Sequence, residues 1–224
     1  MDFIFMLTRH DATVPDALDL IEPARRAGVR HIGFKDVGAA PERLVDLAKA
    51  IREAGASVWM EVVSTNPRDE LASVRLARDL AVDSLMGGVQ AESALRVLEG
   101  TPVRYLPFPG RPVGHPTRLE GSPEDVEADC RRFALAGCAG ADLLAFRAVD
   151  ADALALVAAA RRGLGPGGRL IAAGSIDGRA RVRALKAAGA DGFTIGAAAI
   201  AGVYAPGAGD LEAQLRAVLR DAAD

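Results

Sequence analysis

Short apolar runs alternate with amphipathic segments along the whole chain. Eight runs carry the composition of buried strands and predict strands at 3–7, 30–35, 57–63, 83–86, 103–108, 141–146, 169–172 and 192–195. The segments between them repeat apolar residues at helical spacing and predict helices at 14–27, 41–54, 68–81, 90–98, 123–136, 150–163, 178–188 and 209–222. Strands separated by helices of about 10–15 residues indicate βαβ units and a parallel sheet.

Local signals mark the ends of several predicted helices. Asp11 or Thr13 is placed to cap the first helix, with Pro15 in its first turn. Ser122 and Pro123 form a cap and a first helical position before two acidic residues. Glycines follow alanine where four helices must stop, at Gly28, Gly55, Gly137 and Gly189. The strand and helix assignments are therefore supported by the residues between them.

Eight βα units in 224 residues favour closure into one barrel. An open doubly wound sheet usually has fewer strands and a GxGxxG turn after the first, and this sequence has no such turn. No linker or shift in composition marks a second domain. We therefore expect one (βα)8 TIM barrel over residues 1–224, with the long loop at 107–121 as an active-site loop.

Composition and charge narrow the class of protein. Half of the residues are apolar, and the net charge is −3 with basic residues spread along the chain. We find no basic stripe or aromatic platform and expect no nucleic-acid partner. No signal peptide and no apolar run of about 18 residues is present, so we expect a cytoplasmic protein without a membrane span. Cys130 and Cys138 are expected to be reduced, and a homo-oligomer is left open.

Two ionisable residues near strand ends are the strongest catalytic candidates. Only three of the 27 basic residues are lysines, and Lys35 alone ends a predicted strand. Alternation places Lys35 on one face of its strand, and Glu61 lies at a similar height on the next strand. In such a pair the glutamate moves a proton next to a carbonyl and the lysine stabilises the enolate oxygen. The alternative is a structural ion pair between two strands.

Further polar residues follow other strands. His10 is a candidate acid or base, and Arg9 beside it is a candidate for substrate binding. Arg147 has the geometry to bind a carboxylate or phosphate through two donors, or equally to pair with Asp150. His115, in the long loop, is a candidate substrate contact whose alternative is a solvent-exposed side chain. The three histidines lack the close spacing of a zinc motif, so we expect no metal site.

Two glycine corners near the C-terminus predict a phosphate site. Backbone N–H groups at 174–176 and 196–198 follow successive strands and open helices, where they can surround one anion. The segment 169–202 resembles the phosphate-binding end of the ribulose-phosphate-binding (βα)8 barrels, including the isomerase and cyclase of histidine biosynthesis. The resemblance implies phosphate binding by Gly174, Ser175, Gly196 and Ala197. It does not extend to the aspartate that those two enzymes would require after strand 5, where Pro107 to Pro109 stand.

The combined pattern predicts an enzyme that acts on a small phosphorylated substrate, sugar-derived or keto, by acid–base or enolate chemistry. An isomerase is the first expectation. The alternatives are a carbon–carbon lyase of aldolase or decarboxylase type, with Lys35 as a Schiff-base nucleophile, and a barrel that binds a phosphorylated ligand without catalysis. No cofactor is expected, and a flavin or nicotinamide oxidoreductase is the weaker remaining option.

Overall fold

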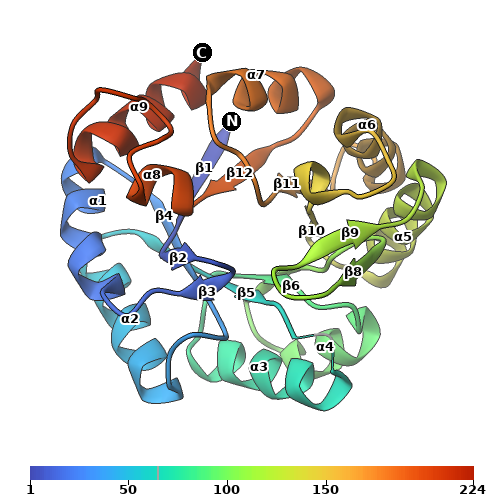
Figure 1. The fold of residues 1–224 in the computed structure, drawn as a ribbon. Helices are drawn as coiled ribbons and strands as arrows, with labels where there is room; N and C mark the ends of the chain where they lie inside the picture. The colour runs from blue at the N-terminus through green and yellow to red at the C-terminus, as the bar shows by residue number, and fades with distance from the viewer. Residues whose placement is uncertain (65) are drawn as a thin grey trace.

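The computed structural model describes residues 1–64 and 66–224, in which eight parallel strands form one sheet surrounded by helices (Figure 1). In sheet order the strands are β10 (Gly140–Leu143), β11 (Arg169–Ala172), β12 (Gly192–Ile195), β1 (Asp2–Met6), β4 (His31–Lys35), β5 (Ser57–Val62), β6 (Ser84–Gly87) and β7 (Arg104–Leu106). The two outer strands meet through hydrogen bonds from Ala139 N to Tyr105 O at 2.9 Å and from Asp142 N to Pro107 O at 3.0 Å. The predicted (βα)8 barrel is confirmed.

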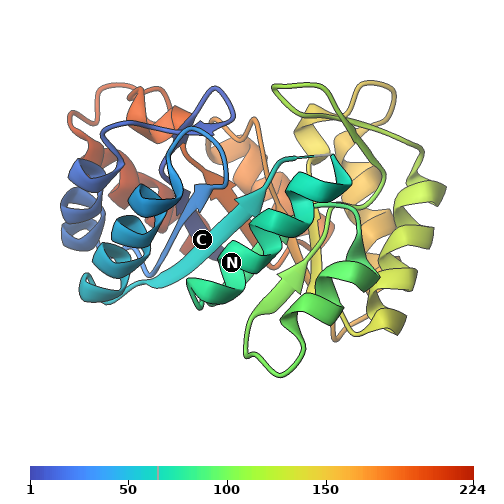
Figure 2. The same ribbon diagram turned by 90° about the horizontal axis from the view of Figure 1, so that it is seen from below.

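The longer helices form the outer ring (Figures 1 and 2). The helical segments are η1 (Ala17–Leu20), α1 (Ile21–Ala27), α2 (Pro41–Glu53), α3 (Pro67–Asp79), α4 (Ala91–Leu98), α5 (Pro123–Ala136), η2 (Ala145–Arg147), α6 (Ala153–Leu164), α7 (Arg179–Ala188), α8 (Ala197–Ile200) and α9 (Leu211–Ala223). Ser122 and Asp125 form a reciprocal capping box at the start of α5, and Gly137 ends it in a left-handed conformation. Among the described residues, no helix is long and apolar enough to cross a membrane.

Apolar side chains fill the barrel on both sides of the sheet. The outer layer packs between strands and helices, and the barrel interior holds Ile4, Met6, Trp59, Met86, Leu106 and Ile171. Gly33 faces this interior, where a Cβ would lie 2.5 Å from the Met6 sulfur and 3.2 Å from the Trp59 Cβ. A larger residue would displace this packing. Gly33, which lies two positions before Lys35 on β4, therefore leaves room for the side chains of Met6 and Trp59 from the neighbouring strands.

Two small antiparallel hairpins extend the strands and were not predicted. Strands β2 (Thr8–Arg9) and β3 (Ala12–Thr13) enclose a two-residue turn in which both His10 (φ 49°) and Asp11 (φ 63°) are left-handed. Such a turn matches the right-handed twist of its strands. Strands β8 (Arg111–Val113) and β9 (Arg118–Glu120) form the second hairpin, within the long loop. Figure 2 shows both hairpin segments along the same side of the barrel.

The structure corrects two predicted boundaries. Neither Asp11 nor Thr13 caps the first helix, because helical structure starts only at Ala17 and both residues belong to the β2–β3 hairpin. The sixth barrel strand ends at Leu143 rather than at Phe146, and residues Ala145–Arg147 form a 3-10 turn. The strand pairing stops there, so Arg147 leaves the barrel wall on a turn above the strand end.

Candidate active site

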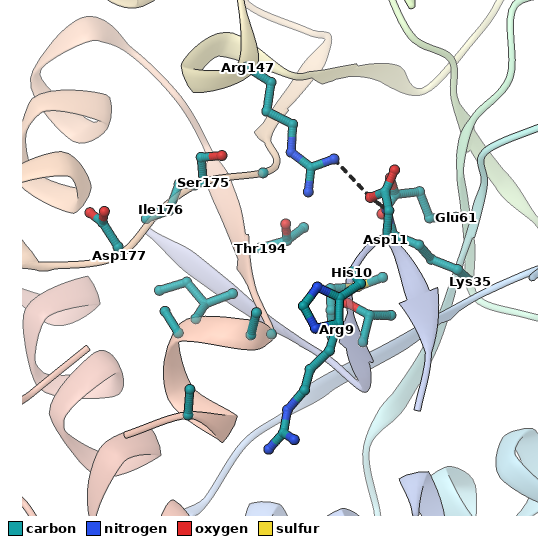
Figure 3. Close-up of a pocket in the computed structure, with 18 of the residues that line it drawn as sticks. Arg9, His10, Asp11, Lys35, Glu61, Arg147, Ser175, Ile176, Asp177 and Thr194 are labelled. Atoms are coloured by element: carbon teal, nitrogen blue, oxygen red, sulfur yellow. Dashed lines mark hydrogen bonds and ion pairs between the residues drawn. The ribbon is translucent and has the colours of Figure 1, made fainter. Parts of the chain in front are cut away.

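A cavity of about 340 Å³ lies at the carboxyl ends of the barrel strands (Figure 3). Nine of the predicted site residues line it, and they come from widely separated parts of the sequence: Arg9, His10, Lys35, Glu61, Arg147, Gly174, Ser175, Gly196 and Ala197. The fold therefore gathers the strand ends of β4, β5, β11 and β12 around one space. In barrels of this kind, the loops at the carboxyl ends of the strands form the active site.

Lys35 and Glu61 are direct partners across two neighbouring strands. The parallel register of β4 and β5 aligns Lys35 with Glu61, and the Lys35 Nζ donates to Glu61 Oε1 at 2.9 Å. Both residues are buried, with 4% and 2% of their surface exposed. Within the described part of the chain, Glu61 Oε2 receives no hydrogen bond. This oxygen is the one available to take a proton inside the cavity.

Asp11 is the second carboxylate on Lys35. Its Oδ1 accepts from Lys35 Nζ at 2.5 Å and from Arg147 Nη1 at 2.8 Å. Its Oδ2 accepts two hydrogen bonds, from the backbone N and the Oγ1 of Thr117, both at 2.8 Å. The left-handed turn at Asp11 directs its carboxylate to these donors. Four donors occupy the carboxylate, so Asp11 serves as an anchor for the two cations rather than as a free base.

The ion pairs determine the charge on Lys35. Burial alone would lower the pKa of the Lys35 amine, but the carboxylates of Glu61 and Asp11 outweigh it and raise that pKa above its ordinary value. Burial alone would raise the pKa of Asp11, but Lys35, Thr117 and Arg147 together hold it well below its usual range. The two ion pairs therefore favour the ammonium form of Lys35, which donates to both carboxylates.

Two backbone corners lie across the cavity from Lys35 and Glu61 (Figure 3). The first follows β11, where Gly174 (φ 77°) and Ser175 (φ 56°) are left-handed. The second follows β12, where a Cβ on Gly196 would lie 2.6 Å from Met6 O, so only glycine fits against β1. Within residues 1–64 and 66–224, the N–H groups of Ser175, Ile176, Ala197 and Ala198 donate to no protein acceptor. Unpaired N–H groups at two adjoining turns are the type of donor set that binds anions in proteins.

Arg147 and Arg9 differ in where they point. Arg147 packs over Gly174 and donates to Asp11 and, at 3.2 Å, to Thr117 O, so the pairing with Asp150 considered above does not form. Arg9 is exposed and donates to Ile200 O at 3.2 Å. Figure 3 shows the Arg9 side chain directed away from Lys35. Arg147 thus links the ion cluster to the β11 corner, whereas Arg9 lies at the outer edge of the cavity.

His115 lies outside the first cavity. It is exposed on the β8–β9 hairpin and lines an adjoining, more open cavity of about 750 Å³. The two cavities share His10, Asp11, Arg147 and Ser175. Arg118 also lines the second cavity, and within the described residues it forms no ion pair. The second space therefore adjoins the first, and its lining includes Arg118 and Arg147 as well as Asp11.

Three residues of this region were missed or misjudged from the sequence. Asp11 was interpreted as a helix cap, and Thr117 carries no signal because its contact with Asp11 spans 106 positions. Asp142 is the third: it is fully buried on β10, and neither of its carboxylate oxygens has a hydrogen-bond partner among the described residues. An aspartate inside the apolar run 141–146 is a signal that was present and not used.

Solved structures share this fold at low sequence identity. Orotidine 5'-phosphate decarboxylase from Pyrococcus horikoshii OT3 matches with a TM-score of 0.66 and 14% identity over 99% of both chains. A structure described as native KDPGal matches with a TM-score of 0.67 and 13% identity over 99% of this chain and 94% of its own. A mandelate oxidase variant with an FMN adduct gives 0.64 and 16% over 99% of this chain and 71% of its own. No protein-family model and no curated protein matches the sequence.

At these identities the similarity shows the fold alone. The comparisons therefore support a (βα)8 barrel over the whole chain. No family within these barrels is assigned.

Proposed function

We propose that the protein is an enzyme that acts on a small phosphorylated substrate by proton transfer. The observation that carries the proposal is the arrangement of one cavity: an ammonium ion between two buried carboxylates on one wall, and unpaired backbone N–H groups on the other. Gly174, Ser175, Gly196 and Ala197 hold the phosphate there. The reacting carbon lies between them and the pair Lys35 and Glu61.

Glu61 and Lys35 divide the chemistry between them. Glu61 Oε2 removes a proton from the carbon next to a carbonyl, and the Lys35 ammonium donates a hydrogen bond to the resulting enolate oxygen. Return of that proton to the neighbouring carbon gives an isomer. His10 stands at the turn beside Asp11 as a second acid or base, and Arg147, Arg9 and His115 contact the rest of the substrate.

Carbon–carbon bond cleavage is the second candidate function. It is favoured by the similarity to orotidine 5'-phosphate decarboxylase over 99% of both chains. In that reaction the electron pair of the broken bond stays on the substrate carbon, and the Lys35 ammonium supplies the proton that quenches it. An imine at Lys35 is disfavoured because the raised pKa of the amine keeps it protonated.

Solvent hydrogen exchange tests the proposal before the substrate is known. A panel of phosphorylated sugars and keto compounds is incubated with the protein in deuterium oxide, and each is followed by NMR. A substrate should gain deuterium at the carbon next to its carbonyl, and isomers or fragments then distinguish the two reactions. Glu61→Gln should slow the exchange by about 10²–10⁴-fold. Exposed Glu53 offers the matched control Glu53→Gln, which should leave the rate unchanged.

A compound that binds and stabilises the protein, but shows neither exchange nor product, would contradict the proposed function. It would support the alternative of a barrel that binds a phosphorylated ligand without turnover. Equal exchange rates for Glu61→Gln and the wild type would place the chemistry elsewhere in the cavity.

A further inference from the structure

Asp142 is a buried carboxyl that has no role in the proposed function. It is 0% exposed, and its position on β10 alternates with Ala141 and Leu143, which belong to the outer core. Its side chain consequently points into the barrel interior. Both carboxylate oxygens lack a hydrogen-bond partner within residues 1–64 and 66–224. An isolated carboxylate in such an apolar environment takes up a proton, because the loss of hydration of the charged form costs too much free energy.

The charged groups that face Asp142 belong to the site described above. They are Glu61 from β5, Lys35 from β4, Arg147 from the turn after β10, and Asp11 from the β2–β3 hairpin. Burial raises the pKa of Asp142 far above its ordinary value, and the Glu61 carboxylate raises it further, while Lys35 and Arg147 act in the opposite direction. Two cations and two carboxylates already balance without Asp142. A neutral Asp142 leaves this cluster without net charge.

We propose that Asp142 holds a proton in the resting fold, while Glu61, which lines the cavity, is the ionised base. When Glu61 takes a proton from the substrate, the pair carries two protons, and release of one restores the starting state. Asp142 thereby acts through Glu61 as a positioning residue, and it keeps a second negative charge away from the base. Its effect on turnover rests on the proposed function, whereas the proton on Asp142 does not.

Infrared difference spectroscopy tests the protonation of Asp142 directly. At neutral pH the wild type should show the carbonyl stretch of a protonated carboxylic acid, and this band should be missing from Asp142→Asn. Exposed Asp150 offers the control Asp150→Asn, which should keep the band. A wild type without such a band, or an unchanged band in Asp142→Asn, would overturn the proposal, because Asp142 would then be ionised in the fold.

A second variant tests the coupling and leaves Asp142 in place. In Glu61→Gln the negative charge beside Asp142 is gone, so the band should disappear at a lower pH than in the wild type. An unchanged midpoint would overturn the coupling between the two carboxyls. This measurement needs no substrate, so its failure is distinct from a failure of the proposed function, which is read from hydrogen exchange.

The pH dependence of stability is a third test, because the direction of the change can be predicted. Asp142 ionises near pH 4 in the unfolded chain and far above that in the fold, so the native state binds more protons between the two values. The melting temperature of the wild type should therefore fall relative to that of Asp142→Asn as the pH rises above about 4. A constant difference across this range would contradict a proton held on Asp142.

Discussion

At the scale of single residues, Lys35 is the centre of the account. A buried ammonium is stable here because the carboxylates of Asp11 and Glu61 accept hydrogen bonds from it, at 2.5 Å and 2.9 Å. Both carboxylates also line the cavity. Replacing Lys35 would remove the cation and leave the two carboxylates buried without a counter-charge. The free energy lost in this way is larger than the free energy that the ion pairs contribute to the fold. The same arrangement favours the ammonium form of Lys35, and Glu61 Oε2 accepts no hydrogen bond within the described residues.

Replacement of Lys35 by methionine should lower the free energy of unfolding by about 3–5 kcal/mol, because Asp11 and Glu61 lose their shared cation. Urea denaturation at neutral pH measures this change. Lys49 is the matched control: it lies on α2 with its side chain 75% exposed, so Lys49→Met should shift stability by less than about 0.5 kcal/mol. Similar effects of the two substitutions would show that the buried cluster contributes little.

Acidification should act through Asp11. The pKa of Asp11 is depressed in the fold, so its contribution is complete above the unfolded value of about 3.9 and is lost as the pH falls towards the folded value. Asp11→Asn should be less stable than the wild type at neutral pH and should lose less stability below about pH 4. Denaturation curves at a series of acidic pH values measure this slope. If Asp11→Asn is as sensitive to acid as the exposed control Asp46→Asn, the depressed pKa is refuted.

At the scale of elements, the β8–β9 hairpin closes one side of the site. Its Thr117 supplies two of the four donors to Asp11, and its backbone carbonyl accepts from Arg147. A loop that is distant in the sequence therefore completes the ion cluster.

Thr117→Val should lower stability by about 1.5–3 kcal/mol, because it removes a hydrogen bond to a buried carboxylate and keeps the volume of the side chain. Thr117→Ser retains the hydroxyl and should be within about 1 kcal/mol of the wild type. Thermal and urea denaturation of both variants provide the comparison. Equal losses in the two variants would mean that the methyl group, and not the hydroxyl, holds the hairpin.

At the scale of elements, the strands and helices could be predicted from the sequence, whereas the contacts between distant segments could not. All eight barrel strands and the main helices were predicted, because alternation and helical spacing are local patterns. The pairing of Lys35 with Glu61 follows from alternation on two neighbouring strands. The hairpins, the contact of Thr117 with Asp11 and the turn that carries Arg147 depend on packing between distant segments. No local pattern encodes them, and Asp142 was passed over although its place in an apolar strand was visible.

At the scale of the whole molecule, the barrel collects functional groups that the chain keeps far apart. Asp11 and Arg147 are 136 positions from each other and form an ion pair at 2.8 Å. The fold alone leaves the reaction undetermined, since similar barrels at 13–16% identity include a decarboxylase and an FMN-containing oxidase. The reaction has to be inferred from the side chains on the strand ends, opposite the two backbone corners.

Calorimetric titration with inorganic phosphate tests the central claim, that these corners hold an anion, most directly. Ala197 is exposed and lines the cavity, so Ala197→Asp should place a carboxylate among the N–H groups without disturbing the core. Ala180 is an exposed alanine near the start of α7 and outside the cavity lining, and Ala180→Asp is the matched control. We predict that Ala197→Asp weakens phosphate binding at least about tenfold, or about 1.4 kcal/mol, while Ala180→Asp binds like the wild type. Equal affinities in all three proteins, or no binding by the wild type, would contradict the account.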